Sequence, residues 1–265
     1  MALQRTFIAT VVMVATVFGA EGASAGVAPR AVQAPVAQAT APTAAPAAAT
    51  TKQSTTETTA EPVCARLKGA EACVGPDGSN RPGVTIEDTA DDKMHPAVEY
   101  YLNGYLGTKY VIHNLARNGE VRGSREIGRT VTFRAALYRG GHRVKYGRWK
   151  TVRNIAKYPV KRETRVSPAA AQDRSRVCTS TKGAATTCFT ERATVVFACD
   201  TKADQYQARA EYFVGGDPTA RFEIHQLAGL NTCGKAEHGD LSVSMYRASV
   251  FDHGRRKGSR LYKYN

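Results

Sequence analysis

One short stretch of the chain carries acid–base and charge-stabilising groups at alternate positions. If 221–225 (Arg-Phe-Glu-Ile-His) is a β-strand, Arg221, Glu223 and His225 share one face and the two apolar residues share the other. Glutamate as general base, histidine as general acid and arginine opposite a phosphoryl group would suit a metal-free phosphodiesterase. The pattern predicts the site of a secreted hydrolase, a small nuclease. A polar strand face with an ion pair explains it equally without any function.

A second segment combines positive charge with aromatic rings. Residues 117–165 contain fifteen Lys or Arg, opposed by Glu120, Glu126 and Glu163. Cations neutralise phosphates, sulfates or uronates, and aromatic rings stack on bases or sugars. The segment predicts a surface that binds an anionic polymer: an acidic glycan, a cell-wall polymer or a nucleic acid. The candidate residues are Arg134, Arg139, Arg143, Lys145, Tyr146, Arg148, Trp149 and Lys150. In the alternative interpretation, Trp149 anchors the core and the charges form its solvated rim.

The beginning of the chain predicts export. An apolar run at 6–20 is shorter than a membrane span, and Ala23-Ser24-Ala25 follows it as a cleavage motif, so residues 1–25 are expected to be a secretory signal peptide. The alternative is an uncleaved anchor. Residues 26–60, rich in Ala, Pro and Thr, predict a disordered linker. We therefore expect a secreted, extracellular protein whose mature form has no transmembrane segment, with its folded domain at 61–265.

All six cysteines lie in that predicted domain, and the chain has a formal net charge of +14. An even number behind a signal peptide predicts three disulfides among fifteen formal pairings. Pairing of nearest neighbours would give Cys64–Cys73, Cys178–Cys188 and Cys199–Cys233. A zinc site is the alternative, but the sequence has no C-x-x-C pair and no matching histidine spacing. We expect no metal and no cofactor.

The pattern of apolar residues predicts a mainly β fold, an antiparallel sandwich or barrel with one N-terminal helix. The helix is expected from Pro96, because apolar residues recur from there at spacings of three and four, and it would end at Gly107. Hairpins are expected at Gly140-Gly141 and Gly215-Gly216. The predicted strands are 109–114, 129–139, 143–154, 193–200, 205–214, 220–227 and 241–251. No regular repeat stands out, 61–94 reads as an irregular lead-in, and 167–187 reads as a loop.

Three functional classes remain open on these grounds. The first is a secreted, basic, disulfide-stabilised protein that binds an anionic polymer or a cell surface. The second is the metal-free hydrolase, to which a late histidine and the basic residues 255–257 could contribute. The third is an exported inhibitor that presents the loop between Cys178 and Cys188 to another secreted protein. The sequence contains no G-x-S-x-G elbow, H-E-x-x-H motif, Walker loop or dinucleotide fingerprint.

Overall fold

The computed structural model describes residues 61–76, 82–116, 118–124, 130–153, 166–175, 177–181, 183–190, 192–259 and 261–265. The predicted signal peptide and linker lie outside these residues and stay predictions. All the described residues belong to one compact unit, Thr55–Asn265. None of its helices in the described ranges is long and apolar enough to cross a membrane.

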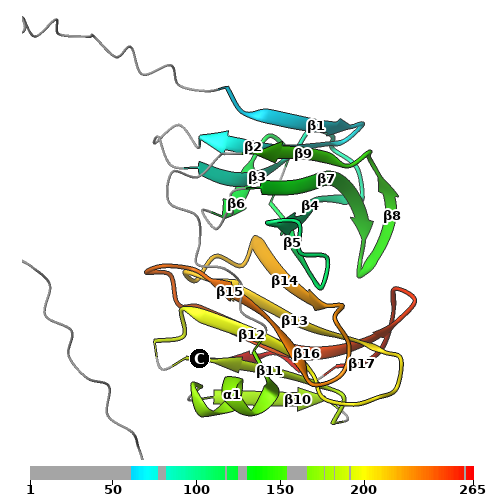
Figure 1. Ribbon diagram of the computed structural model, residues 1–265. Coiled ribbons are helices and arrows are strands. Elements are labelled where there is room, and N and C mark those ends of the chain that lie inside the picture. Colours follow the sequence, from blue (N-terminus) through cyan, green and yellow to red (C-terminus); the bar gives the residue numbers. More distant parts are fainter. Residues whose placement is uncertain are drawn as a thin grey trace, which may run out of the picture. The chain divides into compact units, whose positions relative to one another are not determined.

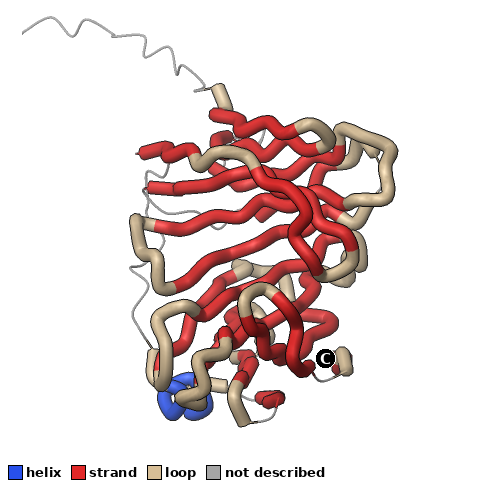
Figure 2. Tube along the Cα trace, turned by 90° about the vertical axis from the view of Figure 1, so that its right-hand side faces the viewer, coloured by secondary structure: helices blue, strands red, loops and turns tan. Residues whose placement is uncertain are grey.

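Antiparallel strands make up most of this unit (Figures 1 and 2). The strands are β1 (Val63–Leu67), β2 (Ala70–Pro76), β3 (Pro82–Asp88), β4 (His95–Leu102), β5 (Thr108–Asn114), β6 (Val121–Ser124), β7 (Thr130–Arg139), β8 (His142–Tyr146), β9 (Lys150–Arg153), β10 (Val177–Thr181), β11 (Ala185–Phe189), β12 (Val195–Asp200), β13 (Gln207–Val214), β14 (Ala220–Gln226), β15 (Thr232–Glu237), β16 (Val243–Asp252), β17 (Arg255–Ser259) and β18 (Lys263–Tyr264). The described residues contain one short helix, α1 (Pro168–Asp173).

The strands form a large central sheet and two small ones. The central, ten-stranded sheet has the order β17-β16-β13-β14-β5-β4-β7-β8, with β18 paired to β16 and β9 to β7. The small sheets have the orders β1-β2-β3-β6 and β10-β11-β12-β15. Both pack on the same face of the central sheet, where Val74 and Val196 join Tyr100, Ile112 and Tyr212 in one buried cluster. The prediction of a mainly β, disulfide-stabilised sandwich is therefore confirmed.

The two halves of the chain repeat one topology (Figure 1). In each half, three strands of a small sheet (β1–β3 or β10–β12) lead into a hairpin of the central sheet (β4–β5 or β13–β14). The next strand (β6 or β15) returns to the small sheet, and a last hairpin (β7–β8 or β16–β17) extends the central sheet. The halves join where β5 pairs with β14. The two halves are therefore related by an approximate two-fold axis, which passes between β5 and β14.

The sequence carries the same repeat, which our search for a regular period missed. Residues 99–115 match 211–227 without a gap at an offset of 211 − 99 = 112, sharing Glu-Tyr at the start and Ile-His-x-Leu at the end. The first disulfide loops also match, since Lys-Gly-Ala follows both Cys64 and Cys178 at the fourth position. Few residues are identical between the two halves. At the other positions the fold requires only an apolar residue on the buried face or a polar residue on the opposite face.

The predicted N-terminal helix is wrong. Its residues form β4 and the turn into β5, and the only helix in the described ranges is α1. Strand β4 is buried on both faces, so its apolar residues form a nearly continuous run whose spacing imitates a helical stripe. The turn signal was Asn103-Gly104: both residues have positive φ, 54° and 72°, as hairpin turns require.

Two further segments differ from expectation. The lead-in 61–94 forms β1, β2 and β3, and the loop 167–187 contains α1, β10 and the start of β11. Small residues line these strands, for example Ala70 and Ala72 in β2, because the small sheets lie close to the central sheet. Alanine carries a weak strand signal in sequence, so packing decides the conformation of these segments. By contrast, both predicted hairpins are present, as β7–β8 and β13–β14.

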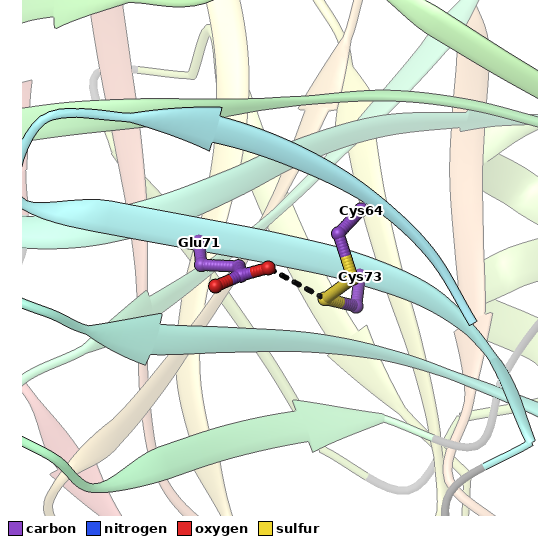
Figure 3. Close-up of side chains that lie close together, drawn as sticks. All are labelled: Cys64, Glu71 and Cys73. Carbon is purple, nitrogen blue, oxygen red and sulfur yellow. Dashed lines mark hydrogen bonds between the residues drawn. A yellow bond between two sulfur atoms is a disulfide. The ribbon is translucent and has the colours of Figure 1, made fainter. Parts of the chain in front are cut away.

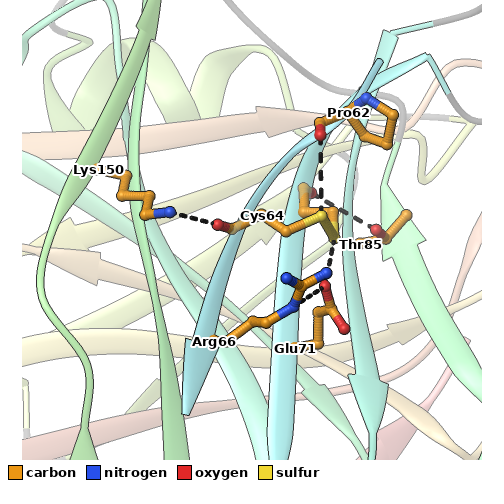
Figure 4. The surroundings of a disulfide bond; sticks show 7 residues. Pro62, Cys64, Arg66, Glu71, Thr85 and Lys150 are labelled. Carbon is orange, nitrogen blue, oxygen red and sulfur yellow. Dashed lines mark hydrogen bonds and ion pairs between the residues drawn. A yellow bond between two sulfur atoms is a disulfide. The ribbon is translucent and has the colours of Figure 1, made fainter.

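The three disulfides join nearest neighbours: Cys64–Cys73, Cys178–Cys188 and Cys199–Cys233. Each pair lies directly across two neighbouring antiparallel strands. The first two occupy equivalent positions in the two halves, between the first and second strands. Figure 4 shows the surroundings of Cys64–Cys73. Three disulfides fit an extracellular or secreted protein.

We predict that Gly234→Ala destabilises the sandwich. A Cβ atom there would lie 2.6 Å from Cγ2 of Thr108 and 2.9 Å from Cγ2 of Ile224, so β15 would be pushed away from the central sheet. Overpacking of this kind costs about 1–3 kcal/mol. Urea denaturation with intact disulfides measures the loss. Gly141→Ala, with no atom within 4 Å of the added Cβ, is the matched control. Equal stability of the two variants would contradict the prediction.

Candidate functional site

The face of the central sheet opposite the small sheets carries a row of charged residues. Directly paired residues of antiparallel strands share a face, so the register places these side chains side by side. From β7 to β16 the row reads Arg134, Glu99, Val111, Glu223, Glu211 and Arg247. We call this surface the polar face. Its three carboxylates are nearly inaccessible to solvent, at 0 %, 5 % and 0 % for Glu99, Glu223 and Glu211.

Glu99 is held by cations from three strands. Arg134 on β7 donates from Nε to Oε2 at 2.8 Å, Arg143 on β8 donates from Nη1 to Oε1 at 3.0 Å, and Lys109 on β5 donates at 3.3 Å. The hydroxyl of Tyr138 donates to Oε1 at 2.6 Å. Burial alone would raise the pKa of Glu99, but Lys109, the Tyr138 hydroxyl and the arginines hold it below its ordinary range.

Glu211 has equivalent partners in the second half. Arg247 stands where Arg134 stands and donates from Nε to Oε2 at 3.0 Å, and Arg256 stands where Arg143 stands and donates to Oε1 at 2.7 Å. Ser249 adds a bond of 2.6 Å. An aromatic ring covers the first arginine of each cluster: Trp149 on Arg134 and Tyr262 on Arg247, with guanidinium–centroid distances of 4.3 and 4.1 Å.

Glu223 has no counterpart, since the equivalent residue is Val111. It lies next to the approximate two-fold axis between the equivalent histidines. Nε2 of His113 lies 3.0 Å from its Oε1, and Nε2 of His225 bonds its Oε2 at 2.8 Å. His95 extends the chain, because its Nε2 lies 3.2 Å from Nδ1 of His113. Nη2 of Arg221 lies 3.1 Å from Oε1 of Glu223.

Burial keeps these imidazoles neutral. Burial and the neighbouring His113 lower the pKa of His95 to about 3, and burial foremost lowers the pKa of His113 and, strongly, that of His225. Positive charge on the polar face therefore exceeds negative charge. Three carboxylates face seven cations, an excess of 7 − 3 = 4; the cations are Lys109, Arg134, Arg143, Arg209, Arg221, Arg247 and Arg256.

A cavity of about 570 Å³ lies on this face, in the range of small-molecule sites. The turns of β7–β8 and β16–β17, at opposite ends of the strand order, both line it with Gly141-His142-Arg143 and His253-Gly254-Arg255. The central sheet is therefore rolled so that its two outer hairpins approach one another. In Figure 1 both hairpins lie on the right, and Figure 2 views the unit from that side. Lys109, Arg209, Gln205 and Gln207 also line the cavity.

The cations of the predicted polyanion surface differ in whether a carboxylate of the protein already pairs with them. Arg134 is buried in the Glu99 cluster, between the rings of Tyr146 and Trp149, and Arg143 also pairs with Glu99. Lys150 is exposed and donates to the carbonyl oxygen of Cys64 at 2.6 Å, tying β9 to β1 (Figure 4). Arg139, Lys145 and Arg148 are exposed, with no carboxylate partner among the described residues. Trp149 and Tyr146 are 39 % and 57 % exposed, so neither is a core anchor.

The residues of the predicted hydrolytic site lie together on β14, where Arg221 and His225 both contact the buried Glu223. Both oxygens of Glu223 are occupied by neighbours, and Nδ1 of His225 is buried without a hydrogen-bond partner in the described ranges. The role in hydrolysis stays a prediction. The predicted inhibitor loop between Cys178 and Cys188 mostly forms β10 and β11, and its Ala184 and Ala185 are buried in a cluster with Ala248 and Val250.

Sequence reasoning missed Glu99, Glu211, Lys109, Arg209 and the pair His95 and His113. The signal was the internal repeat, because aligning its halves brings both Glu-Tyr pairs and both Ile-His pairs together. Arg255 of the basic C-terminal set was noted, but only the rolled sheet places it beside the first basic hairpin.

One group of residues in the described ranges has the spacing of metal ligands: Cys64, Glu71 and Cys73 (Figure 3). The two cysteines are joined as a disulfide and offer no thiolate, while Oε1 of Glu71 bonds Nε of Arg66 at 2.7 Å. This group does not suit a metal ion while it is oxidised.

We predict that Glu99→Gln strongly destabilises the protein. The amide keeps the shape of the side chain but leaves Lys109, Arg134 and Arg143 without their counter-charge in a buried site. Removing one partner of a buried ion cluster costs about 3–5 kcal/mol. Glu71→Gln, which breaks the exposed pair with Arg66, is the control and should cost less than about 1 kcal/mol. Similar losses for the two variants in urea denaturation would refute the prediction.

The free energy of unfolding is expected to fall as the pH decreases below about 6.5. Burial lowers the pKa of His238 to about 4 and that of His95 to about 3, whereas unfolded histidine titrates near 6.5. The unfolded chain therefore binds more protons than the folded chain over this range of pH. Each histidine lowers the free energy of unfolding by up to about 1.4 kcal/mol per pH unit. His238→Gln should flatten the curve between pH 6 and 5, and the exposed His142→Gln should not. Parallel curves for wild type and His238→Gln would contradict this assignment.

No family model and no curated protein matches the chain. Among solved structures, the FN1–FN3 domains of chicken CNTN1 are similar over 72 % of this chain and 64 % of that chain, at 11 % identity and a TM-score of 0.24. This chain thus spans less than two thirds of that CNTN1 chain. A TM-score of 0.24 carries no argument about architecture or function, and the β-sandwich described above rests on the packing of the sheets alone.

Proposed function

We propose that the protein is a secreted binding protein for an anionic polymer, with its contact surface on the hairpins β7–β8 and β16–β17. One observation carries the proposal. Two basic hairpins that are more than a hundred residues apart in sequence line a single cavity with their turns. The disulfides and the β-sandwich are consistent with a secreted binding protein.

The cations available to a polymer are those that no internal carboxylate neutralises. Arg139, Lys145 and Arg148 on or beside the first hairpin and Arg255 on the second are exposed and have no carboxylate partner in the described part of the chain. A cationic surface of this kind binds sulfates, uronates or phosphates by releasing counterions, so its affinity falls steeply with salt. Exposed Tyr146 and Trp149 add rings on which sugars or bases would stack.

The test replaces these four cations with glutamine. Arg139→Gln, Lys145→Gln, Arg148→Gln and Arg255→Gln together should elute from a heparin column at much lower salt than wild type. With single-stranded RNA as probe, each lost contact should lower the slope of log affinity against log salt by about 0.7.

The control variant removes four exposed cations elsewhere: Lys93, Arg174, Arg192 and Lys202. It has the same net charge as the hairpin variant, so any difference between the two reports position. Equal elution of the two variants would overturn the proposed surface. The length of the RNA is followed in the same samples, and its cleavage by wild type would favour the hydrolase instead.

A further inference from the structure

Arg209 on β13 is a buried guanidinium that lines the cavity. The residue is 9 % exposed, and its plane is held from two sides: Nε donates to Oε1 of Gln207 at 2.6 Å, and the ring of Phe251 lies 3.5 Å from the guanidinium carbon. These contacts fix the orientation of the side chain without neutralising its charge. A buried charge normally has an ionic partner, because desolvation of an unpaired ion costs several kcal/mol or more.

The nearest carboxylate is already satisfied. Nη1 of Arg209 lies 3.8 Å from Oε2 of Glu223, beyond hydrogen-bond distance. That oxygen accepts from His225 at 2.8 Å, and the other lies 3.0 Å from His113 and 3.1 Å from Arg221. In the described ranges no other carboxylate oxygen lies within 4 Å of the Arg209 guanidinium. Its terminal N–H groups thus remain available for a partner that none of the described residues supplies.

Comparison of the two halves shows that the equivalent strand of the first half carries no such charge. The residue equivalent to Arg209 is Ala97, which is also buried on the polar face of an equivalent strand. Two arginine partners of each framework carboxylate occupy equivalent positions in the two halves. Arg209 is therefore an addition to the framework, and it stands beside the cavity.

We infer that this cavity binds one oxyanion group, a carboxylate, sulfate or phosphate, and that Arg209 is the side chain that pairs with it. Planar guanidinium groups bind such oxyanions through two parallel hydrogen bonds. Arg255 adds a second cation that has no carboxylate partner in the described ranges, whereas Lys109 and Arg143 are paired with Glu99, which also lines the cavity. The amides of Gln205 and Gln207 provide donors and acceptors for hydroxyl groups next to the charge. The inference deepens the proposed function, since a substituent of the bound polymer is one source of the group and a free small acid is the other.

The full-length protein is titrated with sodium sulfate and with sodium glucuronate at constant ionic strength, using chloride as the balancing salt. The readout is the Nε–H signal of Arg209 in a ¹H–¹⁵N spectrum, identified by its loss in Arg209→Lys. Saturable displacement of this signal by either anion, but not by chloride, is the expected result. No displacement by sulfate or glucuronate would overturn the inference.

Two variants test the pairing itself, with the change in melting temperature on adding each anion as a second readout. Arg209→Lys keeps the charge but loses the fork of donors, and should weaken anion binding about tenfold or more. Gln207→Leu leaves the charge of Arg209 in place, releases its Nε and removes one amide from the cavity, so it should weaken binding several-fold. This variant covers the case in which Arg209→Lys does not fold. Exposed Arg192→Lys is the control. Wild-type affinity in both variants would refute the role of Arg209.

The hairpin variant, in which four exposed cations of the two hairpins are replaced by glutamine, distinguishes a failure of this inference from a failure of the proposed function. If it loses heparin but its Arg209 signal still responds to sulfate, both proposals stand. If wild type binds sulfate at Arg209 and neither polymer, the cavity site stands and the proposed function fails. If wild type binds a polymer and neither anion moves the Arg209 signal, the cavity site fails and the proposed function stands.

Discussion

A carboxylate buried at the centre of each half of the large sheet must be compensated by cations from neighbouring strands. Burial of the Glu99 and Glu211 carboxylates without compensating cations would destabilise the fold, so their arginine partners have to arrive from the next two strands at the correct register. This requirement links the hairpin β7–β8 to β4 and the hairpin β16–β17 to β13. The aromatic residues that cover Arg134 and Arg247 then fix where β9 and β18 lie.

Comparison of the two halves distinguishes the residues that maintain the fold from those that have another role. Groups that occur in both halves, such as the two glutamate–arginine clusters and the pair His113 and His225, maintain the fold. Groups in one half only, Glu223 in place of valine and Arg209 in place of alanine, bring extra charge to the axis between the halves. That charge lies beside the cavity, where both outer hairpins meet.

The sequence predicted the β class, the two glycine hairpins and the alternation in β7 and β14, because these depend on neighbours in the chain. Two disulfides follow the same rule, because Cys64–Cys73 and Cys178–Cys188 each join strands that are consecutive in the chain, whereas Cys199–Cys233 joins β12 to β15 across 34 residues. The helix at Pro96 was wrong because β4 is buried on both faces, so its apolar residues no longer alternate. The strands of residues 61–88 were missed because alanine and glycine have little strand preference of their own and are held in strands here by the sheet that packs closely on them.

Residue types and local spacing by themselves determined that the chain is basic, rich in cysteine, β-structured and predicted to be exported. They also supplied the alternation that puts Arg221, Glu223 and His225 on one face. Tertiary structure decided which cations remain available to bind a ligand. Arg134 and Arg143 are neutralised by Glu99, a residue 35 positions earlier in the chain than Arg134, whereas Arg209 and Arg255 face the cavity. Local sequence cannot show this, because the pairing of buried charges is set by strand register across the whole sheet.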